Sequence, residues 1–160
     1  TCISSARPRA AAKKEAVSMK DQTCAYCMEG GLVDKFGIKI CELPESKVYL
    51  FKEQSHPGRV IVAHKEHVSE MVELTPAQRA AYFEDVNRVA VALHAAFYPK
   101  KVNYGAYGDT GHHLHFHLVP KYEEDAFEWG GTFAMDPQRT FLSAGEYDAM
   151  IARIKAALGV

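Results

Sequence analysis

The chain has 160 residues, of which 48% are hydrophobic and 24% are charged, and its formal net charge is −1. This length and composition predict one soluble globular domain with a single core. The near-zero charge argues against a nucleic-acid polymer or an anionic membrane surface as a partner. No apolar stretch approaches the roughly 20 residues that a membrane-spanning helix needs.

The first 18 residues differ in composition from the rest of the chain. They combine small and polar residues with the basic Arg7 and Arg9, and they lack the apolar segment of a secretory signal. We predict a flexible or vector-derived N-terminal arm over residues 1–18 and one domain over residues 19–160.

Cysteine usage bears on location and on metal binding. The chain has four cysteines without the regular spacing of a secreted disulfide framework, and Cys24 and Cys27 form a C-x-x-C pair. In a reducing cytoplasm, where we expect this protein, that spacing indicates metal binding or redox chemistry. A thioredoxin-like pair would be followed directly by a helix, and Gly30 and Gly31 oppose one here.

Local patterns predict the elements that follow. Alternating residues indicate strands over residues 38–43 and 47–51, joined as a hairpin, and a β-rich central strand over residues 59–63. A helix begins after Thr75, with Pro76 in its first position and Gln78 completing a capping box, and it ends near Phe97. A further strand starts at residue 102, and residues 146–158 form a final helix. This order predicts an α+β fold with a mainly antiparallel sheet, one long helix and a C-terminal helix.

Residues 113–119 read His-Leu-His-Phe-His-Leu-Val. Because side chains alternate along a β-strand, one strand would present His113, His115 and His117 on a single face and bury the apolar residues between them. Imidazoles serve as nucleophile, base or metal ligand near neutral pH. The alternative is a His-rich strand without a function.

This run, with Asn103-Tyr104 before it and Pro120-Lys121-Tyr122 after it, resembles the histidine-triad (HIT) superfamily, whose signature is three histidines alternating with apolar residues. The resemblance implies a HIT-like fold. It also implies an enzyme that acts at the α-phosphate of a dinucleoside polyphosphate or a nucleoside phosphoramidate. The middle histidine, His115, would form a covalent nucleotidyl intermediate, and His117 would orient the phosphate, with His113 completing the catalytic triad.

The same resemblance implies further substrate contacts. Asn103 and Thr110 match positions that contact the α-phosphate, Tyr26 matches one against the base, and the segment Glu53-Gln54 matches one that reaches the ribose. The residues alone also allow structural roles, such as loop capping for Asn103 and Thr110 and a charged strand end for Glu53. Arg59 stands where many relatives carry another active-site histidine.

Zinc favours four nitrogen or sulfur ligands in a tetrahedron, often a C-x-x-C pair with two histidines. The layout here resembles the galactose-1-phosphate uridylyltransferase branch of the superfamily. That resemblance nominates Cys24, Cys27, His67 and His113 as ligands of a structural zinc. The residues alone leave open two free thiols and two surface histidines.

No P-loop or Gly-rich dinucleotide motif competes with this interpretation. A nucleotide hydrolase or nucleotidyl transferase is the leading hypothesis. The alternatives are a non-enzymatic nucleotide- or zinc-binding interaction protein of the same fold and a redox protein that uses Cys24 and Cys27.

The long helix carries more apolar residues than one sheet face needs. Besides its main stripe it has Ala81, Phe83, Ala92 and Ala96. Because monomers rarely expose large apolar patches, this surplus, together with the resemblance, predicts a homodimer. Alternatively, residues 1–18 or 122–142 cover the surplus within one chain.

Overall fold

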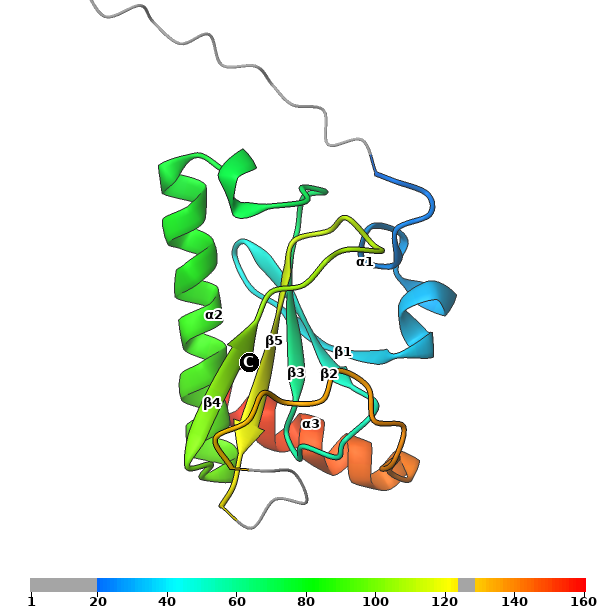
Figure 1. The fold of residues 1–160 in the computed structure, drawn as a ribbon, viewed down its shortest axis with the longest axis vertical. Coiled ribbons are helices and arrows are strands. Elements are labelled where there is room, and N and C mark those ends of the chain that lie inside the picture. Colours follow the sequence, from blue (N-terminus) through cyan, green and yellow to red (C-terminus); the bar gives the residue numbers. More distant parts are fainter. Residues whose placement is uncertain (1–19, 124–128) are drawn as a thin grey trace, which may run out of the picture.

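The computed structural model describes residues 20–123 and 129–160, and the predicted arm over residues 1–18 lies outside them. One five-stranded antiparallel sheet, with strand order β1-β2-β3-β5-β4, forms the centre of the molecule (Figure 1). The predicted α+β class is therefore confirmed. None of the helices in these residues is both long and apolar enough to cross a bilayer.

The first three strands follow the predicted pattern. β1 (Gly37–Glu42) and β2 (Ser46–Phe51) form the hairpin, with Glu42 opposite Lys47 beside the turn. β3 (Val60–His64) pairs antiparallel with β2 and lies at the centre of the sheet. All five residues of β3 are buried, as expected for a central strand covered on both faces.

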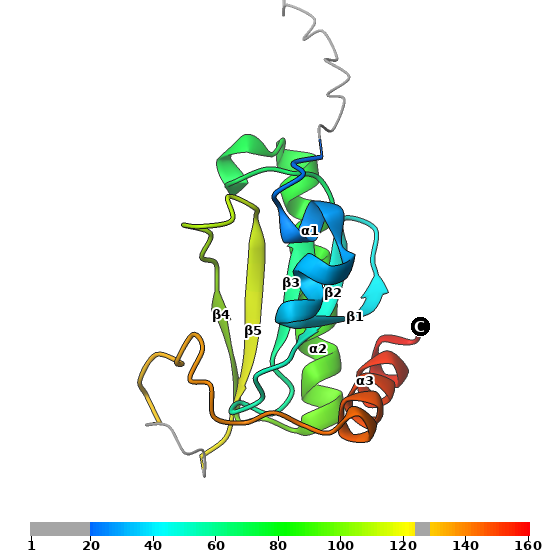
Figure 2. The ribbon, with the colours of Figure 1, turned by 90° about the vertical axis from the view of Figure 1, so that its right-hand side faces the viewer.

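Helix α2 (Pro76–Phe97) covers one face of the sheet (Figure 2). Its start is fixed by the predicted capping box, because the Thr75 hydroxyl accepts a hydrogen bond from the amide of Gln78 while the Gln78 side chain accepts from that of Thr75. Tyr82, Val86 and other residues of the apolar stripe pack on the sheet. Helix α3 (Ala144–Leu158) packs against α2 near the lower end of that helix in Figure 1 and adds Ile154 to the same core.

Ala92 and Ala96 of α2 are buried within the single chain. These two alanines therefore do not require a second subunit to cover them, contrary to the reasoning from the sequence. Phe83 stays 44% exposed, so part of the predicted surplus remains on the surface.

The opposite face of the sheet carries a smaller cluster. Helix α1 (Ala25–Met28) and a 3₁₀ helix (Gly30–Lys35) cover β2 and β3 there, and Tyr26 packs beside Tyr49, Ile61 and Ala63. A second 3₁₀ helix (Met71–Glu73) precedes α2.

The triad strand begins later than predicted. β5 (His115–Lys121) pairs with β3 and with the edge strand β4 (Lys101–Gly105), and His113 precedes it. The amide of Leu114 donates to the carbonyl of Val68, and its carbonyl accepts from the amide of His64. These bonds to two loop residues take the place of regular strand pairing at residues 113 and 114. At its other end, the strand extends to Lys121.

Candidate functional site

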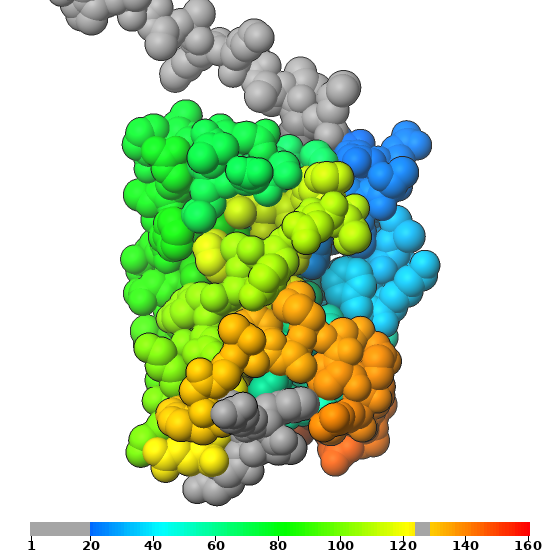
Figure 3. Space-filling model, in the orientation of Figure 1, coloured from blue at the N-terminus to red at the C-terminus, as the bar shows by residue number. Residues whose placement is uncertain are grey.

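The two strand histidines lie on the face opposite α2. His115 pairs with Ala63 and His117 with Ile61, so both imidazoles stand on the side that α1 partly covers. They line a pocket of about 520 Å³ between α1, the loop of residues 106–112 and the segment around Met135. Figure 3 shows the segments around this pocket, with the loop in yellow-green, the N-terminal segment in blue and the segment after residue 132 in orange.

Hydrogen bonding fixes the tautomer of His115. Its Nδ1 lies 2.7 Å from the carbonyl oxygen of His113. Because a carbonyl can only accept, Nδ1 carries the proton and Nε2 keeps a free lone pair. Burial lowers the pKa of His115, opposed in part by the bond to His113, so the ring stays neutral at physiological pH. His115 therefore has the form that a nucleophile requires.

His117 is held in the opposite tautomer. The guanidinium of Arg59 lies 3.1 Å from His117 Nδ1, and a guanidinium can only donate. Nδ1 therefore accepts and Nε2 carries the proton. Burial, with the charge of Arg59 and the neighbouring His115, lowers the pKa of His117 to about 3. The two rings, 5.2 Å apart between centroids, thus offer a lone pair and a neutral N–H donor side by side.

A cluster of four possible metal ligands lies beside these rings. The ligand atoms of Cys24, Cys27, His67 and His113 all lie within 4.8 Å of one another. The Cys24 sulfur is 3.3 Å from His113 Nδ1, the Cys27 sulfur is 3.2 Å from His67 Nδ1, and the two Nδ1 atoms are 3.3 Å apart. A zinc tetrahedron has nitrogen–nitrogen edges of about 3.3 Å and nitrogen–sulfur edges of about 3.6 Å, given its usual bond lengths. The four residues fit that group.

The surroundings prepare these ligands for a metal. His113 Nε2 lies 2.8 Å from the carbonyl of His64, which fixes the proton on Nε2 and leaves Nδ1 free to ligate. His67 Nε2 lies 3.8 Å from the carboxylate of Asp21, a partner of the kind that orients zinc-bound histidines. The free Nδ1 of His113 thus faces the two sulfurs and His67 Nδ1, the arrangement that a metal bound by all four residues would need.

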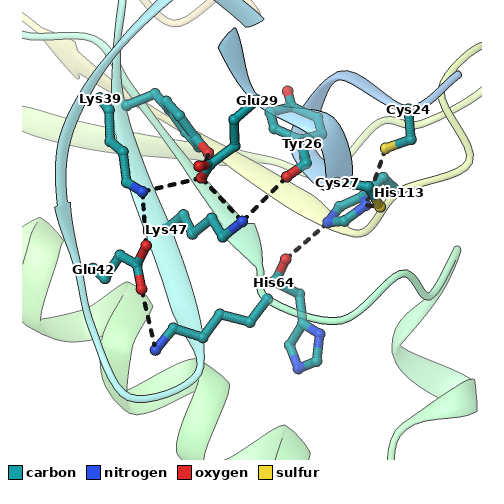
Figure 4. A network of polar contacts seen from close by, with 11 residues as sticks. Cys24, Tyr26, Cys27, Glu29, Lys39, Glu42, Lys47, His64 and His113 are labelled. Carbon is teal, nitrogen blue, oxygen red and sulfur yellow. Dashed lines mark hydrogen bonds and ion pairs between the residues drawn. The ribbon is translucent and has the colours of Figure 1, made fainter. Parts of the chain in front are cut away.

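Helix α1 connects the cluster to the pocket. Tyr26 lies between the two cysteines in sequence, and its ring centroid is 5.1 Å from that of His113 and 5.0 Å from that of His115. After the helix, the Glu29 carboxylate lies 3.0 Å from Lys39 and from Lys47 (Figure 4). These ion pairs fasten the end of α1 to the β1–β2 hairpin.

The other predicted substrate residues lie in different places. Thr110, like Tyr26, lines the pocket of His115. Asn103 lies opposite Val119 and lines a separate cavity of about 200 Å³ with Lys121 and Trp129.

Glu53 and Gln54 do not line the pocket. Both are buried: Glu53 accepts hydrogen bonds from the amides of Ser55 and Thr140, both at 3.1 Å, and Gln54 accepts one from the amide of Gly58 at 2.8 Å. They hold the turn before β3, so the predicted reach to a ribose has no support in this geometry.

Sequence reasoning did not place Phe51, Ile61 or Asp136 in the pocket. The alternation of β2 and β3 could have indicated the first two, because it sets them on the face of His117. No comparable periodicity exists around Asp136.

Comparisons with known proteins agree with this geometry. Residues 37–124 match the family model described as "HIT domain". A histidine triad protein from Sinorhizobium meliloti is 27% identical, with a TM-score of 0.72 over 78% of this chain and 92% of that one. A zinc-bound histidine triad family protein from Mycobacterium smegmatis is 22% identical, with a TM-score of 0.61 over 86% and 94% of the two chains. A comparison with curated protein sequences gives no significant match.

Proposed function

The chain belongs to the HIT domain family, and from this premise we propose that it is a nucleotide hydrolase or nucleotidyl transferase acting at an α-phosphate. The observation that carries the proposal is the pair of opposite tautomers in one pocket. His115 offers an unprotonated Nε2 and His117 offers Nε2–H, both fixed by their other ring nitrogen. A dinucleoside polyphosphate or a nucleoside phosphoramidate would be the substrate.

In the proposed first step, the lone pair of His115 Nε2 forms a bond to the α-phosphorus. The bond from phosphorus to the leaving oxygen or nitrogen breaks, and the leaving group takes that electron pair and a proton from water. His115 then carries the nucleotidyl group and a positive charge. The His113 carbonyl, which accepts from Nδ1–H at 2.7 Å, would stabilise that charge.

In the second step, water or another acceptor attacks phosphorus and gives up its proton to the hydroxide left by the first step. The bond from phosphorus to His115 breaks, and its electron pair returns to Nε2, which restores the neutral ring. His117 Nε2–H would donate a hydrogen bond to a phosphoryl oxygen in both transition states. The pocket walls suit a nucleoside, because the rings of Tyr26, Phe36 and Phe51 and the side chain of Ile61 line it.

We also propose that zinc is bound by Cys24, Cys27, His67 and His113, which the geometry of their ligand atoms supports. Bound there, zinc would have a structural role and would add no reacting group to the pocket. The cluster would hold α1, and with it Tyr26, against the triad.

Turnover of diadenosine tetraphosphate and adenosine phosphoramidate, each with and without inorganic phosphate, tests the function. The full chain should hydrolyse at least one of them, and quenching in alkaline denaturant during turnover should trap a protein heavier by one nucleotidyl group, because the bond from phosphorus to histidine is stable in base and labile in acid. A His115→Ala variant is the control and should give neither product nor adduct. Tight nucleotide binding without turnover or adduct would instead favour the non-enzymatic interaction protein.

A further inference from the structure

Arg59, immediately before β3, is a fully buried cation. Its side chain lies between two aromatic rings, 4.2 Å from the centroid of Phe51 and 5.3 Å from that of Phe133. Burial lowers its pKa to about 10, which still leaves it charged at neutral pH. No carboxylate in residues 20–123 and 129–160 forms an ion pair with it, and its Nε has no partner there.

Such a group is costly to the fold. A buried charge loses its hydration, and the carboxylates of Glu53 and Asp136 act on this guanidinium only from beyond ion-pair distance, where they oppose part of the lowering of its pKa. The cation–π contact with Phe51 offsets only part of that loss. A fold that needed only packing at this position would be served better by an apolar side chain, so the guanidinium calls for a functional explanation.

The hydrogen bonds of Arg59 indicate what it does. One goes to the carbonyl of Ala134 at 3.1 Å and one to His117 Nδ1 at 3.1 Å. Of the two residues that accept these bonds, only His117 lines the pocket. The turn that carries Arg59 is itself held, because the side-chain amide of Gln54 donates through Nε2 to the Arg59 carbonyl at 3.1 Å.

We propose that Arg59 is a positioning residue that keeps His117 as the neutral Nε2–H tautomer, so that His117 acts as a hydrogen-bond donor to the phosphoryl group and not as a charged proton donor. This inference rests on the proposed function. A protonated His117 would need a proton on Nδ1, which would then face the donors of Arg59. The bond therefore excludes both the charged form and the other neutral tautomer.

The chemistry explains why an arginine suits this position. A guanidinium has no acceptor and keeps its proton at physiological pH, so its effect on His117 does not change with conditions. A histidine in its place could donate or accept. A neutral imidazole N–H can stabilise charge on an oxygen in a transition state without giving up its proton.

The first test reads the tautomer without any substrate. In the zinc-loaded full chain labelled with ¹⁵N, the ring nitrogens of His117 should report a proton on Nε2 and none on Nδ1 from pH 5 to 8. The ring nitrogen signals that are missing from the spectrum of the His117→Gln variant are those of His117. In Arg59→Met, the His117 signals should shift toward a mixture of tautomers or toward the protonated ring at the acid end. A wild-type His117 that is protonated on Nδ1 at neutral pH would overturn the proposal.

The second test is kinetic, with a double-mutant cycle. Arg59→Met should lower kcat by about 10- to 100-fold, less than the roughly 10²- to 10³-fold lost when a transition-state donor is removed, with KM changed by less than about twofold. Arg59→Lys, which also can only donate, should recover part of the loss. In the double variant, kcat should be only slightly lower than in His117→Ala alone, because the effect of Arg59 on kcat passes through His117.

Arg153→Met is the matched control. Arg153 also stacks on a phenylalanine, 4.7 Å from the centroid of Phe97, and donates to the carbonyl of Ala96, but it lies on α3 away from the pocket. Its activity should match wild type. If the fold-losses in kcat of Arg59→Met and His117→Ala multiply in the double variant, the two residues act independently. Arg59 would then have a structural effect only, and the proposal would be overturned. Absence of any turnover in wild type would count against the proposed function, while the tautomer measurement would still decide the role of Arg59.

Discussion

The reactivity that we propose for His115 depends on one backbone carbonyl. The His113 carbonyl at 2.7 Å orders the ring and holds the proton on Nδ1, so the nucleophilic nitrogen needs no separate base to free it. Truncation of the His115 side chain would remove the imidazole and leave the backbone carbonyl of His113 in place.

His115→Ala should therefore abolish turnover while leaving the fold intact. We expect a loss of at least about 10³-fold in kcat/KM, because the covalent route disappears. The control is zinc content, which should stay at the wild-type level because His115 is not a ligand of the cluster. A variant that keeps a tenth of the wild-type rate on its best substrate would remove His115 from the nucleophilic role.

Helix α1 is a four-residue element that is fastened at both ends. The cysteine–histidine cluster holds its start, and Glu29 holds its end through Lys39, Lys47 and the Tyr49 hydroxyl at 3.0 Å. Burial alone would raise the pKa of Glu29, but the bonds from these three residues lower it to about 2. The carboxylate thus stabilises the fold in its charged form.

Glu29→Gln should lower the melting temperature at neutral pH, by the equivalent of about 1 kcal/mol for a partly exposed network. Because the folded-state pKa is depressed, the Glu29 contribution is present above pH about 4.5 and is lost as pH falls toward about 2. The difference in melting temperature between the wild-type protein and the Glu29→Gln variant should close over that window. Measurement in a Cys24→Ser/Cys27→Ser background removes the acid sensitivity of the metal cluster. A difference that does not change with pH would contradict this role.

The proposed zinc site belongs to the same scale, because its four residues join α1 to the loops around His67 and His113. Metal analysis of untagged protein prepared without added zinc should give one zinc per chain. The Cys24→Ser/Cys27→Ser variant should contain almost none and should melt at a lower temperature. Because the ligands must be deprotonated, zinc should leave as pH falls. Cys41→Ser is the matched control, since Cys41 lies on β1 outside the cluster and should leave the zinc content unchanged.

At the scale of the whole molecule, the apolar side chains that stay exposed indicate where a second copy of the chain could bind. After burial of Ala92 and Ala96, α2 still exposes Phe83 and 60% of Val91, and the edge strand β4 exposes half of Tyr104. We predict a homodimer that uses α2.

Sedimentation at micromolar concentration should give twice the 17.8 kDa chain mass, and Phe83→Glu should shift the equilibrium toward the monomer. Tyr98→Glu, at an exposed position just after the helix, is the control and should leave the dimer intact. A monomer throughout the concentration range, with unchanged specific activity, would rule out an obligate dimer.

The elements that the sequence predicts well are those set by local chemistry. The hairpin and the capped helix α2 follow from alternation and from Thr75, Pro76 and Gln78. The predicted start of β5 is wrong by two residues, because the bonds that hold Leu114 come from Val68 and His64, which are far away in the chain.

The site shows the same division. Cys24, His67 and His113 are far apart in the chain, with three strands between the first two and helix α2 and strand β4 between the last two, so their predicted convergence rests on the resemblance. The sequence left two roles open for Glu53, and its contacts with the amides of Arg139 and Thr140 could not be foreseen, because those residues lie in a segment without periodicity. The role of Arg59 depends on the register between β3 and β5, which no local pattern encodes.

His113 takes part in both centres with different atoms. Its Nδ1 lies in the metal cluster, and its carbonyl holds the Nδ1 proton of His115. Occupancy of one centre and chemistry at the other are then thermodynamically linked, and such linkage is reciprocal. Metal binding could favour the position of the His113 carbonyl that stabilises the charged, nucleotidylated His115. In that case the nucleotidylated protein must bind its metal more tightly than the free protein does. A chelator would then remove the metal more slowly during turnover than from the protein at rest.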